Sequence, residues 1–402
     1  MATAPATLDS LLLDAFPSIR CAERALSPRV RYPVYSGEFW TAQQRQMDPL
    51  HYVLSYRGSF KPELPAFFIR RYSRPGDVVF DPFAGRGTTV LQAVLDGRRG
   101  WGNDANPMFE RVCRAKVCPA TVEEVEAFLD EVDWDREAPE AEGLDLGMFY
   151  HERTLRELLA LRHHVRATSS PTARFVELLA LSRLHGHSSG FFSVYSFPQI
   201  SVPREAQRRI NARRNQVPEY RDVASRIVRK ARQALRGCDP VALRRAGARC
   251  MLTTGDARDL VDVPTSSVHL IVTSPPFLDK VDYLLDNWLE MWFLGIDLGP
   301  QSEAIVQTPD LERWMEFMAG SLVEMRRVLR HGGTCVVEVG DVNHNHRDIN
   351  LDELIADLAM DAGFRVEAVL VQVQSFTKLA HCFRVENNRK GTNTNRCVVL
   401  RK

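Results

Sequence analysis

The sequence lacks several features that define common protein classes. Its eight cysteines include no Cys-x-x-Cys pair, which argues against a zinc ribbon and against a disulfide framework. No apolar run approaches the roughly 18–20 residues that cross a bilayer, and no basic residue precedes the first short apolar stretch. There is no internal repeat. These absences predict a cytoplasmic protein with no membrane span and no metal site.

The composition is that of an ordinary globular protein, with 402 residues, 45% hydrophobic and 26% charged, enough for one large domain or two smaller ones. The net charge of +1 hides an asymmetry. Residues 201–249 contain 14 Lys and Arg against 4 Asp and Glu, a net charge of +10, which leaves −9 for the rest of the chain. This stretch predicts a polyanion-binding surface; the alternative is the solvated face of amphipathic helices.

Apolar runs bounded by turn residues predict seven strands that alternate with helices, which is typical of a doubly wound, mostly parallel Rossmann-like α/β sheet. The strands are expected at 76–81, 99–103, 249–253, 268–273, 333–339, 364–373 and 396–400. Helical spacing of apolar residues interrupts this pattern over 151–168, 172–186 and 219–237. The chain therefore divides into a first sheet segment (1–105), a helical insertion (106–248) and a second sheet segment (249–402).

A glycine-rich turn follows the first predicted strand, in Asp81-Pro-Phe-Ala-Gly-Arg-Gly-Thr-Thr89. Gly85 and Gly87 allow the backbone to approach a ligand, and Asp81 can accept hydrogen bonds from an ammonium group. Asp104 lies about 20 residues further on, where a nucleotide-binding unit places its ribose-binding carboxylate. An ordinary tight turn is the alternative.

A second motif, Thr273-Ser-Pro-Pro-Phe277, follows the strand that ends near Val272. Two successive prolines hold the chain extended, so the carbonyls of Ser274 and Pro275 are left free. A hydroxyl, spare carbonyls and the ring of Phe277 suit a planar base that carries an exocyclic amine. The alternative is a proline turn with a phenylalanine in the core.

Together these motifs make the chain similar to the S-adenosylmethionine-dependent amino-methyltransferases of DNA, which modify cytosine N4 or adenine N6. Thr273–Phe277 resembles motif IV of that family, and Asp81–Thr89 resembles motif I. Matches to motifs X, II and III and to the stretch after motif IV are Phe60–Leu64, Gly102–Asp104, Gly255–Ala257 and Val281–Gly295. The order of the motifs is that of a circularly permuted relative of many cytosine-N4 enzymes.

The resemblance implies a class I methyltransferase core, S-adenosylmethionine as cofactor and no metal. The catalytic residues would be Ser274, Pro275, Pro276 and Phe277. The cofactor-binding residues would be Lys61, Pro62, Asp81, Phe83, Ala84, Gly85, Gly87, Thr88, Asp104, Asp256, Ala257 and Thr273. Within this set, Asp104 would bind the ribose hydroxyls and Asp256 and Ala257 would border the adenine.

The resemblance also implies double-stranded DNA as partner, a flipped base and direct in-line methyl transfer. The Ser-Pro-Pro-aromatic form favours cytosine N4 over adenine N6, and methylation at carbon 5 is disfavoured because no Pro-Cys occurs. An adenine-N6 enzyme, an RNA amino-methyltransferase and an inactive cofactor-binding protein that binds nucleic acid are the alternatives. A cognate restriction endonuclease and association with the nucleoid through DNA are further expectations.

The two motifs are about 190 residues apart along the chain, and the insertion 106–248 between them is the predicted region of target recognition. Its DNA-binding residues would be Arg204, Arg208, Arg209, Arg213, Arg214, Arg226, Arg229 and Lys230. Four aromatic residues precede them: Phe191, Phe192, Tyr195 and Phe197. A small core beneath a loop is the favoured interpretation of these four, with stacking on bases as the alternative.

Overall fold

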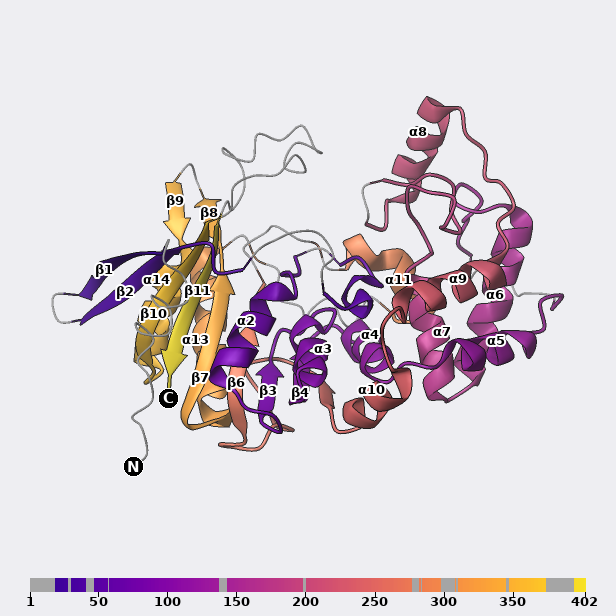
Figure 1. Ribbon diagram of the computed structural model, residues 1–402. Helices are drawn as coiled ribbons and strands as arrows, with labels where there is room; N and C mark the ends of the chain where they lie inside the picture. Colours follow the sequence, from indigo (N-terminus) through magenta and orange to yellow (C-terminus); the bar gives the residue numbers. More distant parts are fainter. Residues whose placement is uncertain are drawn as a thin grey trace.

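The structure of the protein is a computed structural model (Figure 1). It describes residues 19–27, 30–40, 47–56, 58–136, 143–197, 200–276, 282, 284–297, 308, 310–344, 347–373 and 394–402. The strands are β1 Arg20–Ser27, β2 Val30–Gly37, β3 Val78–Asp81, β4 Arg99–Asp104, β5 Met251–Thr254, β6 Val268–Thr273, β7 Leu329–Val339, β8 Asp341–His344, β9 Arg347–Asn350, β10 Arg365–Val373 and β11 Thr394–Arg401.

The α-helices are α2 Glu63–Tyr72, α3 Thr88–Leu95, α4 Met108–Val117, α5 Val122–Asp130, α6 Glu152–Ala167, α7 Pro171–Leu181, α8 Arg204–Arg214, α9 Val223–Ala234, α10 Pro240–Gly247, α11 Trp288–Leu294, α13 Leu311–Val328 and α14 Leu351–Asp361. Two short 3₁₀ helices, η1 Pro49–Tyr52 and η2 Leu285–Asn287, precede α2 and α11. None of the described helices has the length and apolar character needed to cross a membrane.

Within the described residues, one mixed sheet has nine strands in the order β1-β2-β10-β11-β7-β6-β3-β4-β5. The predicted count of seven was therefore wrong. Strands β7, β6, β3, β4 and β5 run parallel, whereas β11 is antiparallel to both of its neighbours and β1 is antiparallel to β2. The seven predicted strands all exist. The sheet is mixed because the pairs β1–β2, β10–β11 and β11–β7 are antiparallel, whereas its other neighbouring pairs are parallel.

The two strands of this sheet that the sequence did not predict lie at one edge of it, and the sequence also did not predict β8 and β9, which form a separate two-stranded sheet. β2 contains Pro33, a residue that strand interiors seldom tolerate, and β1 alternates little in polarity. β2 pairs in parallel with β10, more than 300 residues further along the chain, at Val34↔Val369 and Tyr35↔Leu370. This long-range pairing, together with the burial of Tyr32 and Tyr35, supplies the stabilisation that local propensity does not.

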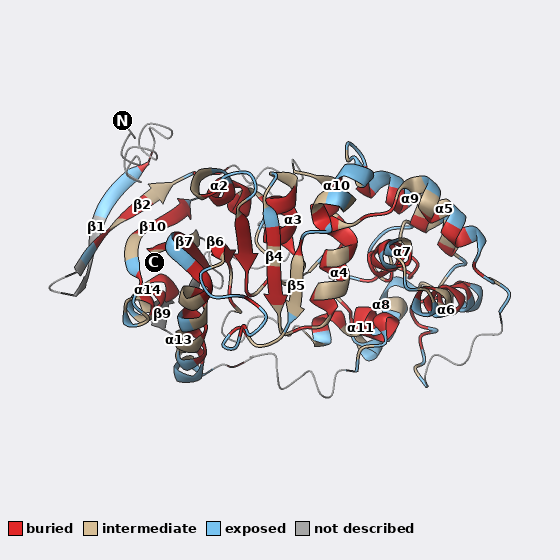
Figure 2. Ribbon diagram, turned by 90° about the horizontal axis from the view of Figure 1, so that it is seen from below, coloured by how far each residue is buried: buried red, intermediate tan, exposed pale blue. Residues whose placement is uncertain are grey.

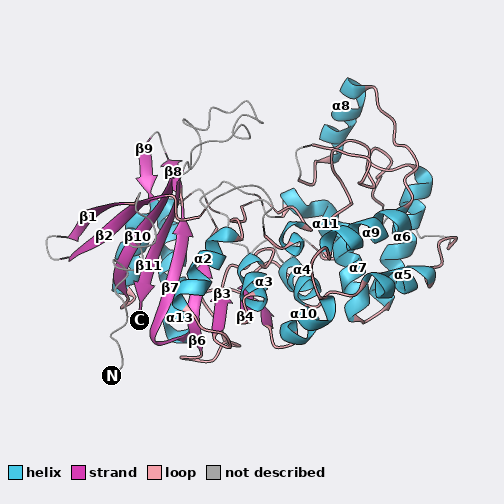
Figure 3. Ribbon diagram, viewed as in Figure 1, coloured by secondary structure: helices cyan, strands magenta, loops and turns pink. Residues whose placement is uncertain are grey.

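Helices cover both faces of the sheet. On one face α13 and α14 bury Trp314, Met318 and Ile355 against β6 and β7, and on the other α2 buries Phe68 and Ile69. A third apolar cluster begins on α3 and α4 and continues through α5, α6, α7 and α9 to α11. Figure 3 shows these helices gathered beside the strands, and Figure 2 shows buried positions on α4 and α7 as well as on the sheet. The helical segment therefore shares a core with the sheet and is held firmly against it.

Local sequence explains where several of these helices begin. The Thr121 hydroxyl accepts from the Glu124 backbone N–H (3.2 Å) while the Glu124 carboxylate accepts from the Thr121 N–H (2.7 Å), a reciprocal cap for α5. Pro171 stands in the first turn of α7 after the capping residue Ser170. α9 buries Val223, Ile227 and Ala231, each four residues apart.

Candidate active site

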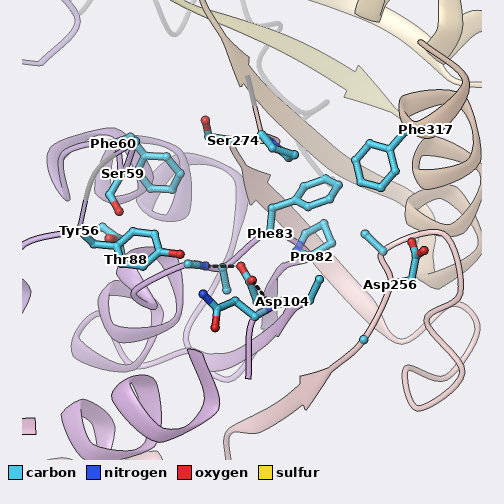
Figure 4. A pocket seen from close by; sticks show the side chains of 18 residues that line it. Tyr56, Ser59, Phe60, Pro82, Phe83, Thr88, Asp104, Asp256, Ser274 and Phe317 are labelled. Atoms are coloured by element: carbon cyan, nitrogen blue, oxygen red, sulfur yellow. Dashed lines mark hydrogen bonds between the residues drawn. The ribbon is translucent and has the colours of Figure 1, made fainter. Parts of the chain in front are cut away.

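A cavity opens where β3, β4 and β6 end, which is the edge at which α/β sheets bind their ligands. Figure 4 shows Tyr56, Ser59 and Phe60 on one side of it, Phe83 and Phe317 on the other, and Asp104 between them. The remaining wall residues are Gly58, Pro82, Ala84, Gly85, Thr88, Ala105, Asn106, Gly255, Asp256, Ala257, Ser274 and Pro276. Residues from motifs I to IV thus meet in one cavity.

The glycine turn has the backbone conformation that only glycine adopts without strain. Gly85 lines the cavity with a φ of +52°, and its N–H donates to Asp104 Oδ2 at 2.7 Å. Gly87 lies outside the cavity wall. It precedes α3 with a φ of +76°, and a Cβ there would lie 2.5 Å from the sulfur of Cys113 on α4. Gly87 therefore permits close packing of the turn on α4, and Gly85 permits the approach to a ligand.

We expect Gly87→Ala to destabilise the fold by about 3 kcal/mol, because a left-handed backbone conformation and overpacking both oppose it. Gly97→Ala is the matched control, since Gly97 has a φ of +78° and a Cβ added there would meet no atom within 4 Å. It should lose only about 1 kcal/mol. Urea unfolding measures both free energies of unfolding, and equal losses would contradict the steric role assigned to Cys113.

Asp104 is the central acid of the cavity. Its second oxygen, Oδ1, accepts from the Asn106 N–H at 2.8 Å, so both oxygens are fixed by backbone donors. Burial raises the pKa of Asp104 to about 6, although these hydrogen bonds act to lower it. Each carboxylate oxygen keeps a lone pair that can accept from a ligand hydroxyl.

Asp104→Ala is expected to raise the dissociation constant for S-adenosylmethionine by about 10- to 100-fold, the loss typical of hydrogen bonds to a charged group. Isothermal titration calorimetry gives this value. Asp262→Ala, a change in an exposed loop, is the control. Because Asp104 also holds the backbone of Gly85 and Asn106, the thermal midpoint of each variant is compared with that of the wild type. An unchanged affinity would remove Asp104 from the cofactor site.

Asn103 was missed by the sequence analysis. Its side-chain amide donates to the carbonyls of Pro82 (3.3 Å) and Gly255 (2.9 Å), and its oxygen accepts from the Thr253 hydroxyl (2.9 Å). The side chain is buried and ties the loops after β3 and β5 to β4. It therefore holds opposite walls of the cavity in register.

Asp81 and Thr273, both predicted to contact the cofactor, pair with each other just beneath the cavity. The Thr273 hydroxyl donates to Asp81 Oδ1 at 2.6 Å, and neither residue lines the wall. Burial raises the pKa of Asp81 to about 7, against the effect of its hydrogen bonds. This pair joins the ends of β3 and β6, so it positions motifs I and IV relative to each other.

Ser274 lies at the cavity rim beside a buried acid that the sequence analysis did not identify. β6 and β7 run parallel with Thr273 opposite Val337, so the next residues, Ser274 and Glu338, are neighbours. The side chains of Ser274 and Glu338 are hydrogen-bonded, and Asn395 of β11 also bonds the carboxyl. Glu338 is 5% exposed, and burial raises its pKa to about 7.

Of the described residues after Ser274 in this segment, only one lines the cavity. Pro276 lines it, and its carbonyl accepts from the Trp314 indole N–H at 2.8 Å, which fixes the segment to α13. Pro275 is buried and does not line it. Phe277, Val281 and Tyr283 lie outside the described residues.

Apolar rings form much of the wall, and two of them come from positions that the motifs do not include. Phe317 of α13 packs against Phe83 with ring centroids 5.7 Å apart, and Tyr56 stands across the cavity. Asp256 forms an ion pair with Arg258 at 2.6 Å. Burial alone would raise the pKa of Asp256, but the hydrogen bonds from Arg258 hold it below its usual value.

The residues predicted from motif X to bind the cofactor, Lys61 and Pro62, lie a few positions after the residues that form one wall of the cavity. Lys61 is exposed and Pro62 is buried, and neither lines the cavity. Instead Gly58, Ser59 and Phe60 form that wall, because α2 begins at Glu63 and turns the chain away from the cavity. The correction follows from the position of the helix, which the sequence pattern did not fix to the residue.

The predicted DNA-binding residues fall into two groups. All five arginines of α8 are exposed, and so is Arg229. Arg226 donates to the carbonyls of Ser189 (3.1 Å) and Asp222 (2.9 Å), and Lys230 is only 6% exposed. Of the four aromatic residues, Phe192 is fully buried, as the small-core interpretation predicts, whereas Phe197 is 36% exposed.

The cavity fits S-adenosylmethionine by its chemistry. Asp104 offers acceptors for ribose hydroxyls, Gly85 exposes backbone, and Phe83 and Phe317 offer flat apolar surfaces. Within the described part of the chain, no group of three His, Cys, Asp or Glu side chains is placed to hold a metal ion.

The cavity lies at the carboxyl edge of the parallel strands of the mixed sheet, and together with the family match it places the chain among the S-adenosylmethionine-dependent methyltransferases. The chain belongs to the DNA methylase family of N6 and N4 enzymes, whose sequence profile matches residues 31–114 and 268–395, more than half of its length. S-adenosylmethionine is the cofactor of this class.

Two curated relatives are methyltransferases. The chain is 20% identical over 279 residues to the Type II methyltransferase M.BsoBI of Geobacillus stearothermophilus, covering 63% of this chain and 54% of that protein. It is 27% identical over 88 residues to the Type II methyltransferase M.MjaII of Methanocaldococcus jannaschii, covering 22% and 17%. The matches thus span about half of one relative and less than a fifth of the other.

Solved structures are less similar. TTHA0409 of Thermus thermophilus, in complex with S-adenosyl-L-methionine, is 24% identical, with 37% of this chain and 53% of that chain covered and a TM-score of 0.23. TrmN of Thermus thermophilus is 14% identical, with 86% and 50% covered and a TM-score of 0.32. TM-scores of this size do not bear on function.

Proposed function

We propose that the protein transfers the methyl group of S-adenosylmethionine to an exocyclic amine of a base in DNA, and that this amine is N4 of cytosine. The observation that carries the proposal is the position of Ser274. Its hydroxyl stands at the rim of the cavity that contains Asp104 and is hydrogen-bonded to the buried Glu338. Membership of the DNA methylase family supports DNA as the substrate.

The difficulty of the reaction lies in the amine, because its lone pair is delocalised into the base. A residue that accepts an amine hydrogen favours the tetrahedral form, in which the lone pair is available. Ser274 can do this when its own hydroxyl hydrogen is donated to Glu338, which leaves both oxygen lone pairs open. The sequence also predicted a catalytic role for Pro275, but this residue is buried and does not line the cavity, so Ser274 is the acceptor in this proposal. Bound S-adenosylmethionine supplies an electrophilic methyl group on a sulfonium.

The other residues position and shield the reactants. Phe83 and Phe317 cover one side of the cavity and limit access of water, and Asp104 fixes the cofactor sugar in this proposal. The amine nitrogen would bond to the methyl carbon as the carbon–sulfur bond breaks. The extra proton of the amine would pass to the Ser274 oxygen while the Ser274 hydroxyl hydrogen moves to the Glu338 carboxylate. A base in duplex DNA must leave the stack to reach Ser274, at a cost of a few kcal/mol.

The helical segment 106–248 supplies the proposed DNA surface. The exposed arginines of α8 and Arg229 are the phosphate-binding candidates, whereas the burial of Lys230 leaves it little surface for such a contact. Two relatives are Type II methyltransferases, which supports a DNA modification enzyme. A cognate restriction endonuclease remains a prediction from the sequence.

Transfer of radiolabelled methyl groups tests the substrate class. The protein is incubated with labelled S-adenosylmethionine and equal masses of unmethylated duplex DNA and total RNA, and each nucleic acid is then digested with DNase or RNase. The proposal predicts label that DNase releases and RNase does not. Label released only by RNase would overturn it in favour of an RNA amino-methyltransferase.

A further inference from the structure

α8 projects beyond the rest of the helical segment, toward the side to which β3 and β7 point (Figure 1). That is the side on which the cavity with Ser274 opens, since β3, β4 and β6 end there. The helical segment packs on the sheet side of the molecule through one apolar cluster, and hydrogen bonds from side-chain amides hold α8 to that segment. A duplex that brings a base to Ser274 would therefore present its neighbouring base pairs to this side of the molecule.

α8 is fixed to the body by amides and hardly by apolar side chains. Gln207 donates to the Tyr195 carbonyl (3.0 Å) and to Asn211 Oδ1 (2.7 Å), and Asn211 donates to the Met148 carbonyl (2.8 Å). Gln216, which follows the end of the helix, donates to the same two acceptors, the Tyr195 carbonyl (3.0 Å) and Asn211 Oδ1 (2.8 Å). Ile210 is the one buried apolar side chain of α8. This network orients the helix and leaves its arginines on the outside.

The arginines of α8 differ in what they contact. Arg208 forms ion pairs with Glu205 and with Asp145 (2.8 Å), and Arg214 lies over the ring of Tyr195 at 3.8 Å. Arg209 and Arg213, one helical turn apart, form no ion pair or hydrogen bond with any described residue. Both line a groove between α8 and the chain before it, whose floor is apolar: Phe197, Ile200, Val202, Pro203, Ala206 and Ile210.

We propose that α8 enters the major groove of the target duplex and that Arg209 and Arg213 read guanines there. This inference rests on the proposed DNA substrate and names the residues that select the sequence around the methylated base. A major groove admits an α-helix, and the commonest specific contact in it is a bidentate arginine on guanine O6 and N7. The two guanidinium groups are available for such contacts, and the apolar floor with the exposed ring of Phe197 suits thymine methyl groups.

The test uses a duplex library with random sequence, methylated by the full-length protein and sequenced to read which positions are modified. Two double variants are compared, Arg209→Lys with Arg213→Lys, which keeps the charge, and Arg209→Ala with Arg213→Ala. Lysine retains attraction to phosphate but lacks the planar fork that recognises guanine. We expect the lysine variant to keep duplex binding within about threefold and to lose the requirement for at least one guanine in the motif. The alanine variant should raise KM for DNA at least about tenfold.

The control is Arg245→Ala with Arg249→Ala, which removes the same charge from two exposed arginines four residues apart. Arg245 belongs to α10 and Arg249 follows its end by two residues. α10 lies on the side of the molecule away from α8 (Figure 1). This control should keep both the motif and KM. An unchanged motif in the lysine variant overturns the assignment of Arg209 and Arg213 to base reading, whatever its KM.

A failure of the proposed methylation activity gives a different result from a failure of the role assigned to α8. If the wild type methylates no duplex DNA, that proposal falls, and α8 is then tested by fluorescence anisotropy with the same duplexes. Equal affinity of the alanine variant and of the Arg245 and Arg249 control overturns the role of α8 independently of any methylation. A selective loss in the alanine variant supports α8 as the DNA-contacting helix.

Discussion

Ser274→Ala is expected to lower kcat for methyl transfer by about 10²- to 10⁴-fold while leaving the dissociation constant of S-adenosylmethionine within about twofold. The range is that of a lost acid–base or charge-stabilising partner. Ser274 stands at the rim of the cavity and not among the residues that surround Asp104, so cofactor affinity should be nearly unaffected. Single-turnover kinetics with duplex DNA measures the first quantity and calorimetry the second.

Ser267→Ala is the matched control for this change. Ser267 lies just before the other end of β6, where its hydroxyl donates to the Pro264 carbonyl at 2.6 Å. It should keep the wild-type rate. Wild-type turnover by Ser274→Ala would show that the amine hydrogens are accepted elsewhere, and a parallel loss of cofactor affinity would show that the serine acts on binding.

Glu338→Gln is expected to remove the pH dependence of the rate of methyl transfer. The carboxylate form of Glu338 accepts the Ser274 hydroxyl hydrogen, and burial raises the pKa of Glu338 to about 7. The wild-type single-turnover rate should therefore rise with pH through a midpoint near 7. Glutamine still accepts a hydrogen bond but does not titrate, so the variant should be about tenfold slower at pH 8 and flat across this range.

Glu367→Gln serves as the control, because Glu367 lies on β10 and forms its ion pairs with Arg365 and Arg401. Its rate should keep the wild-type pH profile. A Glu338→Gln profile that still rises through pH 7 would assign the titration to another group, Asp81 being the nearest in pKa.

Stability has the opposite pH dependence. Because the pKa of Glu338 is raised from 4.5 to about 7 by folding, the neutral acid favours the native state. This contribution is fully present below pH 4.5 and is lost as the pH rises through 7. The rate of methyl transfer and the free energy of unfolding should consequently change in opposite directions over the same interval.

The sequence predicted those parts of the site that are continuous in the chain. The turn around Gly85, the acid Asp104 and the start of the Ser274 segment each follow a strand, and parallel strands bring their ends to one edge. Neighbouring residues also predicted the helices near 151–168, 172–186 and 219–237, which the structure places at α6, α7 and α9. The pattern of neighbouring residues in the sequence was sufficient to predict these elements and the site residues that directly follow a strand.

The missed residues come from elements whose contribution depends on long-range packing. Glu338 reaches Ser274 through the β6–β7 register, and Phe317 reaches Phe83 from α13. Neither residue belongs to a recognisable motif, and an acid within an apolar strand was the one local signal for Glu338. β2 was missed for the same reason, since it joins the sheet by pairing with β10, and β1 joins the sheet only through β2. The position of α2, which excludes Lys61 from the cavity, depends on packing as well.

The most direct test of the central claim is nucleoside analysis of DNA after the reaction. Unmethylated genomic DNA is incubated with the protein and S-adenosylmethionine, digested to nucleosides and examined by mass spectrometry, with Ser274→Ala as the blank. The account predicts N4-methylcytosine with the wild type and none with the variant. N6-methyladenine would overturn the choice of cytosine while keeping the amino-methyltransferase, and the absence of any methylated nucleoside in DNA would contradict the proposed function itself.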